Sequence, residues 1–572
     1  MSRRDFLISI MAAGAGTACG SSSEPPGTAG APASAEPFPR GIETYAEDYR
    51  NWTRELDIAG LRTFAPRTPE DVVAAANWAA RNGHQLRARG MRHNWSPLTV
   101  SFNTTAVSPL VVADTTAFLN RVEMVTDSEQ PAVRAEAGIL MEDLLDFLQQ
   151  HGFGFTAVPA VGDVTLGGVL AINGHGCAIP AVDEAPLAQQ SYGSMSNRVL
   201  SLLAVVWDGG LGQYALRRFE RNDPQIGALL AHLGRAFIVE ATLAVEPNQN
   251  LRCQSYIGIA ASELFAPPGS GGRDIASFLD SAGRIESIWY PFTERPWLKV
   301  WSVAPQKPPG SRAVTRPYNY AFSDNLPRAV TDLAQALVSG QPQLAPLFGK
   351  TIYEATLAGL VATLSLDLWG PSKDLLLFIK PTTLRIHELS YVVLTSRGNV
   401  QQVLSDFTAE YLSRLQAYRD QGRFPVNMPV EYRVTGLDRA PDIGAVSAQE
   451  AMLSAIVPRP DHPEWDTAVW LSLLTIPTTP DMYAFFRDIE QWMLGHFVGS
   501  DAALRPEWSK GWAYTQTAAW EDGAVLGQTI PGLLRAGRPA DANWDAALQT
   551  LRDLDPANIY RNDFLDRLMP AS

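Results

Sequence analysis

Two loops of the sequence gather residues that could hold an anionic ligand and react with it. The segment RARGMRHNWSP (87–97) places His93 among three arginines and a tryptophan. A neutral imidazole nitrogen is a competent nucleophile near physiological pH, although a lone loop histidine also fits a structural role. The segment PAVGDVTLGGVLAINGHG (159–176) holds five glycines. Glycines let backbone N–H groups approach an anion such as a pyrophosphate, but they also form tight turns without any ligand.

A second group of residues could move protons beside an apolar ligand. In VEYR the alternation of a strand places Glu431 and Arg433 on one face, as site residues or as a solvent-side ion pair. Glu286 lies in RIESIWYPF among apolar strand residues. Burial there would raise the pKa of its carboxyl group toward a value useful to a general base. Glu294 and Glu354 have similar neighbours and are alternatives for this role.

The elements around these loops alternate between helix and strand. Thr68 and Pro69 begin a helix that Gly83 ends, as expected for an N-cap, a first-turn proline and a C-terminal glycine. Further patterns predict strands at 84–89, 109–114, 132–138 and 198–208, a helix at 140–152, and a helix before Gly234 with a strand after it. The strand at 198–208 ends in a hairpin turn at Asp208-Gly209. This order indicates an α+β arrangement with helices packed on a mixed sheet.

Composition narrows the classes of partner. The chain has 572 residues and a net charge of −14. Its length is typical of two to four domains, and the acidic balance without a basic stripe argues against a nucleic-acid partner. Only Cys177 and Cys253 follow the N-terminal region, and they form no recognisable disulfide framework.

The N-terminus resembles an export signal. MSRRDFLISIMAAGAGTACGSSS has paired arginines followed by an apolar run too short to span a bilayer. The order Ser-Arg-Arg-Asp-Phe-Leu is similar to a twin-arginine signal, which predicts an exported protein, secreted or periplasmic. We expect a signal at 1–20 and a flexible Ser-, Pro-, Gly- and Ala-rich linker at 21–44. A lipid anchor at Cys19 is the alternative.

Six segments in this order resemble the FAD-binding domain of the vanillyl-alcohol-oxidase-type flavoproteins. They are the helix after Thr68, RARGMRHNWSP, AEAGILMEDLLDFL, PAVGDVTLGGVLAINGHG, SYGSMSNRVL…WDGG and LGRAFIVEATL. RPEWSKGWAY and YRNDFLDRL resemble the C-terminal segments that close this domain. The resemblance implies an α+β fold with a two-part FAD-binding domain (45–247 and 462–572) and a mixed-sheet substrate-binding cap (248–461).

The resemblance also implies a flavin bonded covalently to His93. The family loop ends Gly-His-Ser, whereas here Arg92 precedes the histidine and Asn94-Trp95 separates it from Ser96. Arg92 is therefore expected to supply charge to the pyrophosphate. FTAVPAVG lacks the cysteine of doubly linked members, so only one link is expected. The implied cofactor contacts are Arg89, Gly90, Met91, Arg92, His93, Asn94, Ser96, Pro159, Gly162, Asp163, Thr165, Leu166, Gly167, Gly168, Asn173, Gly174, His175, Gly176 and Val239.

The cap is rich in aromatic and aliphatic residues, which favours an apolar substrate over a sugar. RIESIWYPFTERPWLKVWSV and NMPVEYRVTG resemble the covalent-flavin (class II) cholesterol oxidases. That family oxidises the 3β-hydroxyl of sterols with oxygen, giving the 4-en-3-one and hydrogen peroxide. The resemblance assigns a gate and charge partner to Glu431 and Arg433. We place the base at Glu286 and a positive charge beside the flavin at Lys510, which otherwise is an exposed loop lysine.

Other functions stay open on the sequence alone. An alcohol or sugar oxidase of the same flavin family is the enzymatic alternative, because the flavin domain does not determine the substrate. A secreted binding protein that kept the fold and lost the flavin is the alternative from another class. Sterol and molecular oxygen are the expected partners, with transient contact to membranes or lipid particles and a monomeric state.

Overall fold

The computed structural model describes residues 36–126, 130–320, 327–377 and 384–570. The predicted export signal, Cys19 and most of the predicted linker lie outside the described residues. The linker prediction is wrong for 36–44, because this part packs on the first helix instead of running free. The indole N–H of Trp78 donates to the Glu36 carbonyl at 2.9 Å, and the Phe38 ring lies 5.0 Å from the Trp78 ring.

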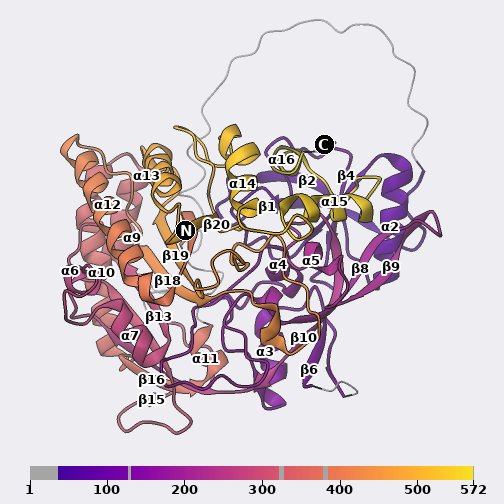
Figure 1. Ribbon diagram of the computed structural model, residues 1–572. Helices are drawn as coiled ribbons and strands as arrows, with labels where there is room; N and C mark the ends of the chain where they lie inside the picture. Colours follow the sequence, from indigo (N-terminus) through magenta and orange to yellow (C-terminus); the bar gives the residue numbers. More distant parts are fainter. Residues whose placement is uncertain (1–35, 127–129, 321–326, 378–383, 571–572) are drawn as a thin grey trace, which may run out of the picture.

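The chain forms two bodies of helix and sheet that lie side by side (Figure 1). One body contains a small sheet in the order β1-β2-β4-β3, with β1 Thr44–Arg50, β2 Asp57–Phe64, β4 Leu110–Asp114 and β3 Gln85–Arg89. Helix α2 (Pro69–Asn82) follows the predicted pattern: Asp71 accepts from the Thr68 N–H at 3.3 Å, and Gly83 ends it in the left-handed region. These residues confirm the predicted helix and the strands around it.

A second sheet of the same body has the order β5-β6-β10-β8-β9. Its strands are β5 Val122–Val125, β6 Ala132–Glu136, β10 Phe237–Ala244, β8 Val199–Asp208 and β9 Gln213–Glu220. The hairpin after Asp208 is confirmed, since β8 and β9 pair directly across it. The accompanying helices are α3 Met141–Gln150, α4 Leu166–Ala171 and α5 Ile226–Leu229. The helix predicted before Gly234 is thus a single short turn, and β7 (Phe153–Gly154) pairs with β11 (Glu246–Pro247).

The other body is built on a nine-stranded sheet in the order β15-β16-β12-β14-β13-β18-β19-β17-β20. The strands are β15 Arg312–Ala313, β16 Asp367–Pro371, β12 Asn250–Tyr256, β14 Trp297–Val303, β13 Arg284–Trp289, β18 Val430–Gly436, β19 Thr467–Thr475, β17 His387–Thr395 and β20 Ala502–Pro506. Only the β15–β16 pair is parallel among these pairs, so the sheet is mixed as predicted. The boundary predicted between 461 and 462 is wrong, because β19 and β20 belong to this sheet.

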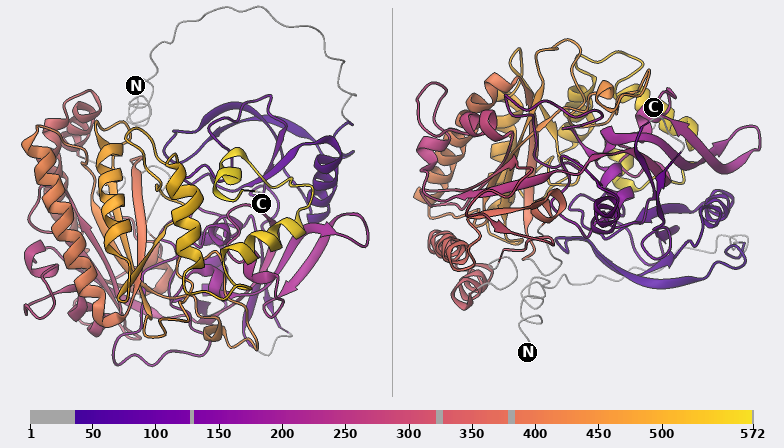
Figure 2. Two further views of the ribbon diagram at one scale, coloured as in Figure 1. Left: turned by 45° about the horizontal axis from the view of Figure 1, so that its top comes forward. Right: turned by 90° about the horizontal axis from the view of Figure 1, so that it is seen from below.

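Long helices cover one face of the nine-stranded sheet (Figure 2). Tyr432 of β18 packs its ring on Phe407 of α12, 5.9 Å away, so this side of the strand faces the helices. Its neighbours Glu431 and Arg433 consequently point to the opposite face, toward the first body. The helices of this body are α6 Ala261–Leu264, α7 Ile275–Ala282, α9 Arg328–Val338, α10 Ala345–Ala362, α11 Ser372–Leu376, α12 Val400–Asp420 and α13 Met482–His496.

The C-terminal segment returns to the first body. It contains α14 Ile530–Arg535, α15 Trp544–Leu554 and α16 Asp563–Leu568. The Leu86 N–H of β3 donates to the Ile559 carbonyl at 2.8 Å, and the ring of Tyr560 packs near Phe237 of β10. Within the described part of the chain, no helix is both long enough and apolar enough to span a membrane. The α+β fold class with a two-part first domain is confirmed.

Candidate active site

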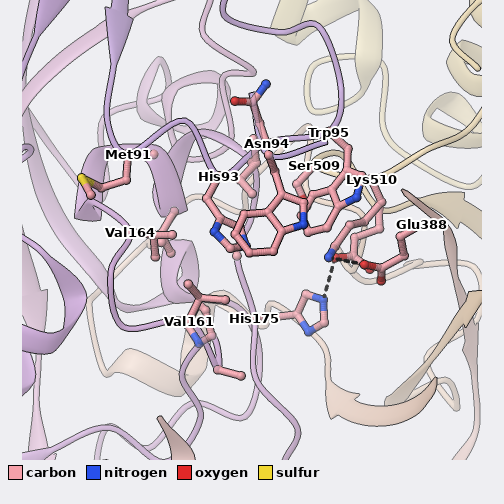
Figure 3. A pocket seen from close by; sticks show the side chains of 18 of the residues that line it. Met91, His93, Asn94, Trp95, Val161, Val164, His175, Glu388, Ser509 and Lys510 are labelled. Carbon is pink, nitrogen blue, oxygen red and sulfur yellow. Dashed lines mark hydrogen bonds and ion pairs between the residues drawn. The ribbon is translucent and has the colours of Figure 1, made fainter. Parts of the chain in front are cut away.

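A cavity of about 450 Å³ lies where the two bodies meet. The first body contributes the loop that contains His93 and the glycine-rich segment, and the second contributes the exposed face of its large sheet. Figure 3 shows His93, Trp95, His175, Glu388 and Lys510 facing this space. The cavity therefore brings together side chains from both halves of the sequence.

Most of the predicted cofactor residues line this cavity. They are Arg89, Gly90, Met91, Arg92, His93, Asn94, Pro159, Thr165, Gly167, Gly168, Asn173, Gly174, His175 and Gly176. Several glycines are required by close packing between the loops. A Cβ atom on Gly90 would lie 2.2 Å from Thr165 Oγ1, and one on Gly176 would lie 2.6 Å from the Val158 nitrogen. The glycine at position 90 thus lets the two loops meet, independently of any ligand.

Five predicted cofactor residues do not line the cavity: Ser96, Gly162, Asp163, Leu166 and Val239. Ser96 is buried and its hydroxyl donates to the Trp508 carbonyl at 2.8 Å. Leu166 packs in the core, and Val239 faces the opposite side of β10 from Ile238, which does line the cavity. Successive residues of a strand point to opposite sides, so Ile238 lines the cavity and its neighbour Val239 does not.

His93 lies in an environment that keeps its imidazole neutral. Burial lowers the pKa of His93 to about 3, and the positive charges of Lys510 and Arg385 act in the same direction. Its ring lies 3.9 Å from the Trp52 ring and 5.5 Å from the Trp95 ring, measured between centroids. A neutral imidazole retains the nitrogen lone pair, so His93 is a nucleophile throughout the physiological pH range.

The side chain of Arg92, which was predicted to supply charge to the pyrophosphate, pairs with a carboxylate of the protein. Its guanidinium donates to Glu47 Oε1 at 2.8 Å, and Arg89 donates to the same oxygen at 2.6 Å. Glu47 on β1 therefore already compensates these charges. The backbone of Arg92 has a φ of +59°, in the left-handed region that glycine adopts most easily. Arg92 thus keeps the backbone conformation expected of the family glycine while directing its side chain to the protein.

One end of the cavity, at the loop of His93, offers unused donors to an anionic group. Among the described residues, no acceptor is found for the backbone N–H groups of Met91, Arg92, His93 and Asn94, which are consecutive and line the cavity. The buried indole N–H of Trp52 also lacks an acceptor in this part of the chain. A run of free amides around a left-handed residue forms a concave anion site. These residues fit a phosphate-bearing, ring-containing cofactor such as FAD.

The other end of the cavity is apolar. It is lined by Ile288, Tyr290, Trp297, Trp301, Tyr320, Ile352, Leu376, Leu384, Ile386, Met428, Pro429 and Leu474. These side chains come from strands, helices and connecting loops of the second body, and they offer few polar partners for a sugar. A chamber of this character binds a ligand chiefly by removing apolar surface from water.

Charged groups from three adjacent strands lie between the two ends. Arg433 donates to Glu286 Oε1 at 2.7 Å and also to Glu431 Oε2, while Lys299 pairs with the other oxygen of Glu286. Lys299 and Arg433 lower the pKa of Glu286 to about 2 although burial opposes them. Burial raises the pKa of Glu431 to about 7, because Arg433 and Lys510 do not offset it and Glu286 and Glu388 add negative charge.

This arrangement reverses the predicted roles of the two glutamates. The expectation that burial would raise the pKa of Glu286 is wrong, because two cations hold its carboxylate ionised. Glu431 is the group whose pKa suits proton transfer near neutral pH. The alternatives Glu294 and Glu354 are exposed on the surface and do not line the cavity. The interpretation of Glu431 and Arg433 as a solvent-side pair is also wrong, since both line the cavity.

Lys510 lies in the cavity rather than in solvent. Its ammonium group pairs with Glu388 Oε2 at 2.6 Å and lies 3.6 Å from the centre of the Trp95 ring. Neither Glu388 nor Glu507 was identified as a site residue from the sequence, although Glu507 lies in RPEWSKGWAY, which resembles a C-terminal segment of the flavin domain. Glu507 accepts from the Ser390 hydroxyl at 2.6 Å and lies 3.7 Å from His175. The alternation of β17 places Glu388 and Ser390 on one face of the strand, and this pattern could have identified Glu388 from the sequence.

Two family models match the chain. The substrate-binding domain of cholesterol oxidase matches residues 250–570, and a FAD-binding domain matches residues 61–211. A solved structure described as a solvent-stable cholesterol oxidase is 55% identical, with a TM-score of 0.92, and the match covers 94% of this chain and 100% of that one. A cholesterol oxidase from Brevibacterium sterolicum is 44% identical, with a TM-score of 0.92 and the same coverage.

More distant relatives are named for other substrates. An L-gulonolactone oxidase from Bos taurus is 25% identical over 273 residues, which are 46% of this chain and 53% of that protein. The chain thus matches about half the length of this relative. The mitochondrial L-galactono-1,4-lactone dehydrogenase of Brassica oleracea is 20% identical over 572 residues, 94% of this chain and 84% of that protein.

Proposed function

The chain belongs to the cholesterol oxidase family defined by this substrate-binding domain, and we propose from that premise that it oxidises the 3β-hydroxyl of sterols with molecular oxygen. When bound, FAD accepts a hydride from the carbinol carbon and passes two electrons to oxygen. The observation that carries the proposal is one continuous cavity, which joins the amide-lined loop of His93 to an apolar chamber. The charged residues Glu431 and Arg433 line the same cavity.

Glu431 is the proton acceptor of this proposal. Its carboxylate takes the hydroxyl proton of the sterol as the hydride leaves the carbinol carbon, and this proton and the hydride supply both hydrogens of hydrogen peroxide. Arg433 holds Glu431 in place through its hydrogen bond. Glu286 neutralises Arg433 and Lys299 and stays ionised throughout. Once ionised again, the Glu431 carboxylate can move a proton from C4 to C6 and convert the 5-en-3-one to the 4-en-3-one.

A coupled measurement of oxygen and product tests this function. The purified protein, mixed with cholesterol in detergent, should consume oxygen, form hydrogen peroxide in equal amount and yield a conjugated enone. L-Gulono-1,4-lactone and simple sugars should give no consumption above background, because the chamber offers them few polar partners. Oxygen consumption with the lactone and none with the sterol would make the chain a sugar-lactone oxidase of the same flavin fold.

The rate of flavin reduction should depend on the ionisation of Glu431. The base form is the carboxylate, and burial raises its pKa to about 7. Reduction by sterol under anaerobic conditions should therefore increase as the pH rises through about 7 and level off above it. A stopped-flow pH series measures this. A rate that falls through the same range would show that the protonated form is the active one.

We propose that the flavin is bonded to His93. Attachment replaces the imidazole N–H bond and one C–H bond of the flavin 8-methyl group by a C–N bond, and the two hydrogens leave on oxygen as hydrogen peroxide. Acid precipitation of the wild-type protein should carry the yellow colour into the pellet. His93→Ala should release it to the supernatant. Colour that stays in the pellet in this variant would place the link on another residue.

Three further proposals concern the export, the membrane contact and the oligomeric state of the chain. The twin-arginine-like segment supports export of the chain, and its function on sterols supports transient contact with membranes or lipid particles. A monomer is the simplest state for an enzyme whose cavity is lined by one chain. An exported mature protein that still begins at Met1 would contradict the signal.

A further inference from the structure

Trp52 contacts both His93 and a cationic side chain of the other body. The centroid of its indole ring is 3.9 Å from that of the His93 ring, at an interplanar angle of 32°. The guanidinium of Arg385 lies 3.9 Å from the centre of the same indole. Trp52 is buried and lines the cavity. The imidazole and the guanidinium each contact the indole, and we call these three groups the stack; cation–π attraction stabilises the contact with Arg385.

Stacking is the main constraint on the His93 ring. Within the described part of the chain, neither ring nitrogen of His93 forms a hydrogen bond. In most reactive histidines, a hydrogen bond at one nitrogen fixes the ring and its tautomer. Here the plane of the ring is set by Trp52, with the Trp95 ring meeting it edge-on at 5.5 Å.

The segment that contains Trp52 is bound to the His93 loop by its backbone. The Trp52 N–H donates to the Asn94 carbonyl at 3.1 Å, and the Asn51 side-chain amide donates to the Trp95 carbonyl at 3.0 Å. Asn94 and Trp95, whose carbonyls accept these two hydrogen bonds, directly follow His93 in the sequence. The Trp52 backbone is therefore fixed relative to the backbone of the His93 loop.

Three consecutive residues of the second body hold this assembly from outside. Arg385 lies on the Trp52 ring, the Ile386 carbonyl accepts from the Trp95 indole N–H at 2.9 Å, and His387 Nδ1 lies 3.1 Å from Glu55 Oε2. Glu55 also accepts from the Tyr483 hydroxyl at 2.7 Å. We call residues 385–387 the clasp. It connects the substrate-binding body to the loop of the proposed flavin link.

We infer that Trp52 is a positioning residue for the attachment of flavin to His93, and that the clasp holds Trp52 in place. The inference rests on the proposed covalent link. Forming the C–N bond requires the imidazole lone pair to point at the 8-methyl carbon, and a misplacement of about 1 Å can slow such a step by about 10²-fold. The stack fixes the ring in one orientation before flavin binds. The burial and nearby cations that lower the pKa of His93 keep the lone pair available.

The test follows the rate at which the full-length chain, produced without flavin in riboflavin-starved cells, incorporates added FAD covalently. Aliquots are acid-precipitated over time, and the flavin in the pellet is measured. Trp52→Leu, which keeps apolar bulk and removes the ring, should slow incorporation by about 10–100-fold while FAD still binds non-covalently. Trp52→Phe, which retains an aromatic face, should restore the rate to within a few-fold of wild type.

Two further variants make the result specific. Trp78→Ala removes an equally buried indole of the same body outside the cavity, and its incorporation rate should match wild type in the folded fraction. Arg385→Gln removes the charge of the clasp and should slow incorporation by a smaller factor, which keeps the test usable if Trp52→Leu does not fold. Wild-type rates in both Trp52→Leu and Arg385→Gln would overturn the positioning role.

The outcomes separate this inference from the proposed link. If wild-type protein never carries flavin into the pellet, the link to His93 is wrong and the positioning role falls with it. If wild type does and His93→Ala does not, the link holds, and the Trp52 variants alone decide the positioning role. Histidine NMR of the flavin-free protein adds a readout without catalysis: Trp52→Leu should broaden or split the His93 ring signals, and Trp52→Phe should not.

Discussion

Glu431→Gln should lower the rate of flavin reduction by sterol about 10²–10⁴-fold, because it removes the proposed proton acceptor and keeps the size of the side chain. Sterol affinity should change little, since the apolar residues of the chamber provide most of it. The residual rate should also lose the increase with pH that the Glu431 carboxyl causes in the wild type. Anaerobic stopped-flow mixing with sterol measures the rate, and equilibrium titration measures the affinity.

Measuring the second half-reaction, the reoxidation of reduced flavin by oxygen, shows whether the loss in Glu431→Gln is specific to flavin reduction. Reoxidation of chemically reduced enzyme should be affected much less, because that half-reaction removes no proton from the sterol. Reduction at the wild-type rate in Glu431→Gln would remove Glu431 from the chemistry. A fall of equal size in both half-reactions would indicate a disturbed flavin environment instead of a lost base.

Glu286→Gln should lower the free energy of unfolding by about 3–5 kcal/mol, because it leaves Lys299 and Arg433 buried without their shared carboxylate. Equilibrium or thermal unfolding of the flavin-bound protein measures the loss. Glu354→Gln is the matched control, since Glu354 is exposed on α10 and should change stability by less than about 0.5 kcal/mol. An unfolding free energy equal to that of wild type in Glu286→Gln would show that the buried pairs are replaceable.

The ion pairs of Glu286 also predict how acid affects the free energy of unfolding. The pKa of Glu286 is lowered from 4.5 to about 2, so its stabilising contribution is complete above pH 4.5. It is lost as the pH falls from about 4.5 to about 2, where the folded carboxylate takes up a proton. Glu431 has a raised pKa, so its ionisation opposes stability as the pH rises toward 7.

Local sequence patterns were sufficient for α2 and for the loops that line the cavity. The cap and stop signals at Thr68 and Gly83 determine α2 by themselves, because they act within one turn of the helix. The order of glycine-rich loops located the cavity and His93. These features depend on residues close together in the chain, where spacing translates directly into geometry.

Features that depend on distant partners were not predictable in the same way. Glu286, Lys299 and Arg433 come from three neighbouring strands, so the two cations that lower the pKa of Glu286 appear only when the sheet is assembled. Arg92 similarly meets Glu47 from β1, a charged strand that the hydrophobic pattern did not predict. The end of the cap was misplaced because β19 and β20 return to the same sheet from far along the chain.

The central claim is that one cavity holds the flavin and the sterol together, so that the sterol reduces the flavin directly. The measurement that tests it most directly is anaerobic addition of cholesterol to the purified yellow protein, with the flavin absorbance followed over time. One equivalent of sterol should bleach the flavin absorbance completely, and the colour should return when oxygen is admitted. Flavin that stays oxidised with sterol and bleaches with L-gulono-1,4-lactone would contradict the account.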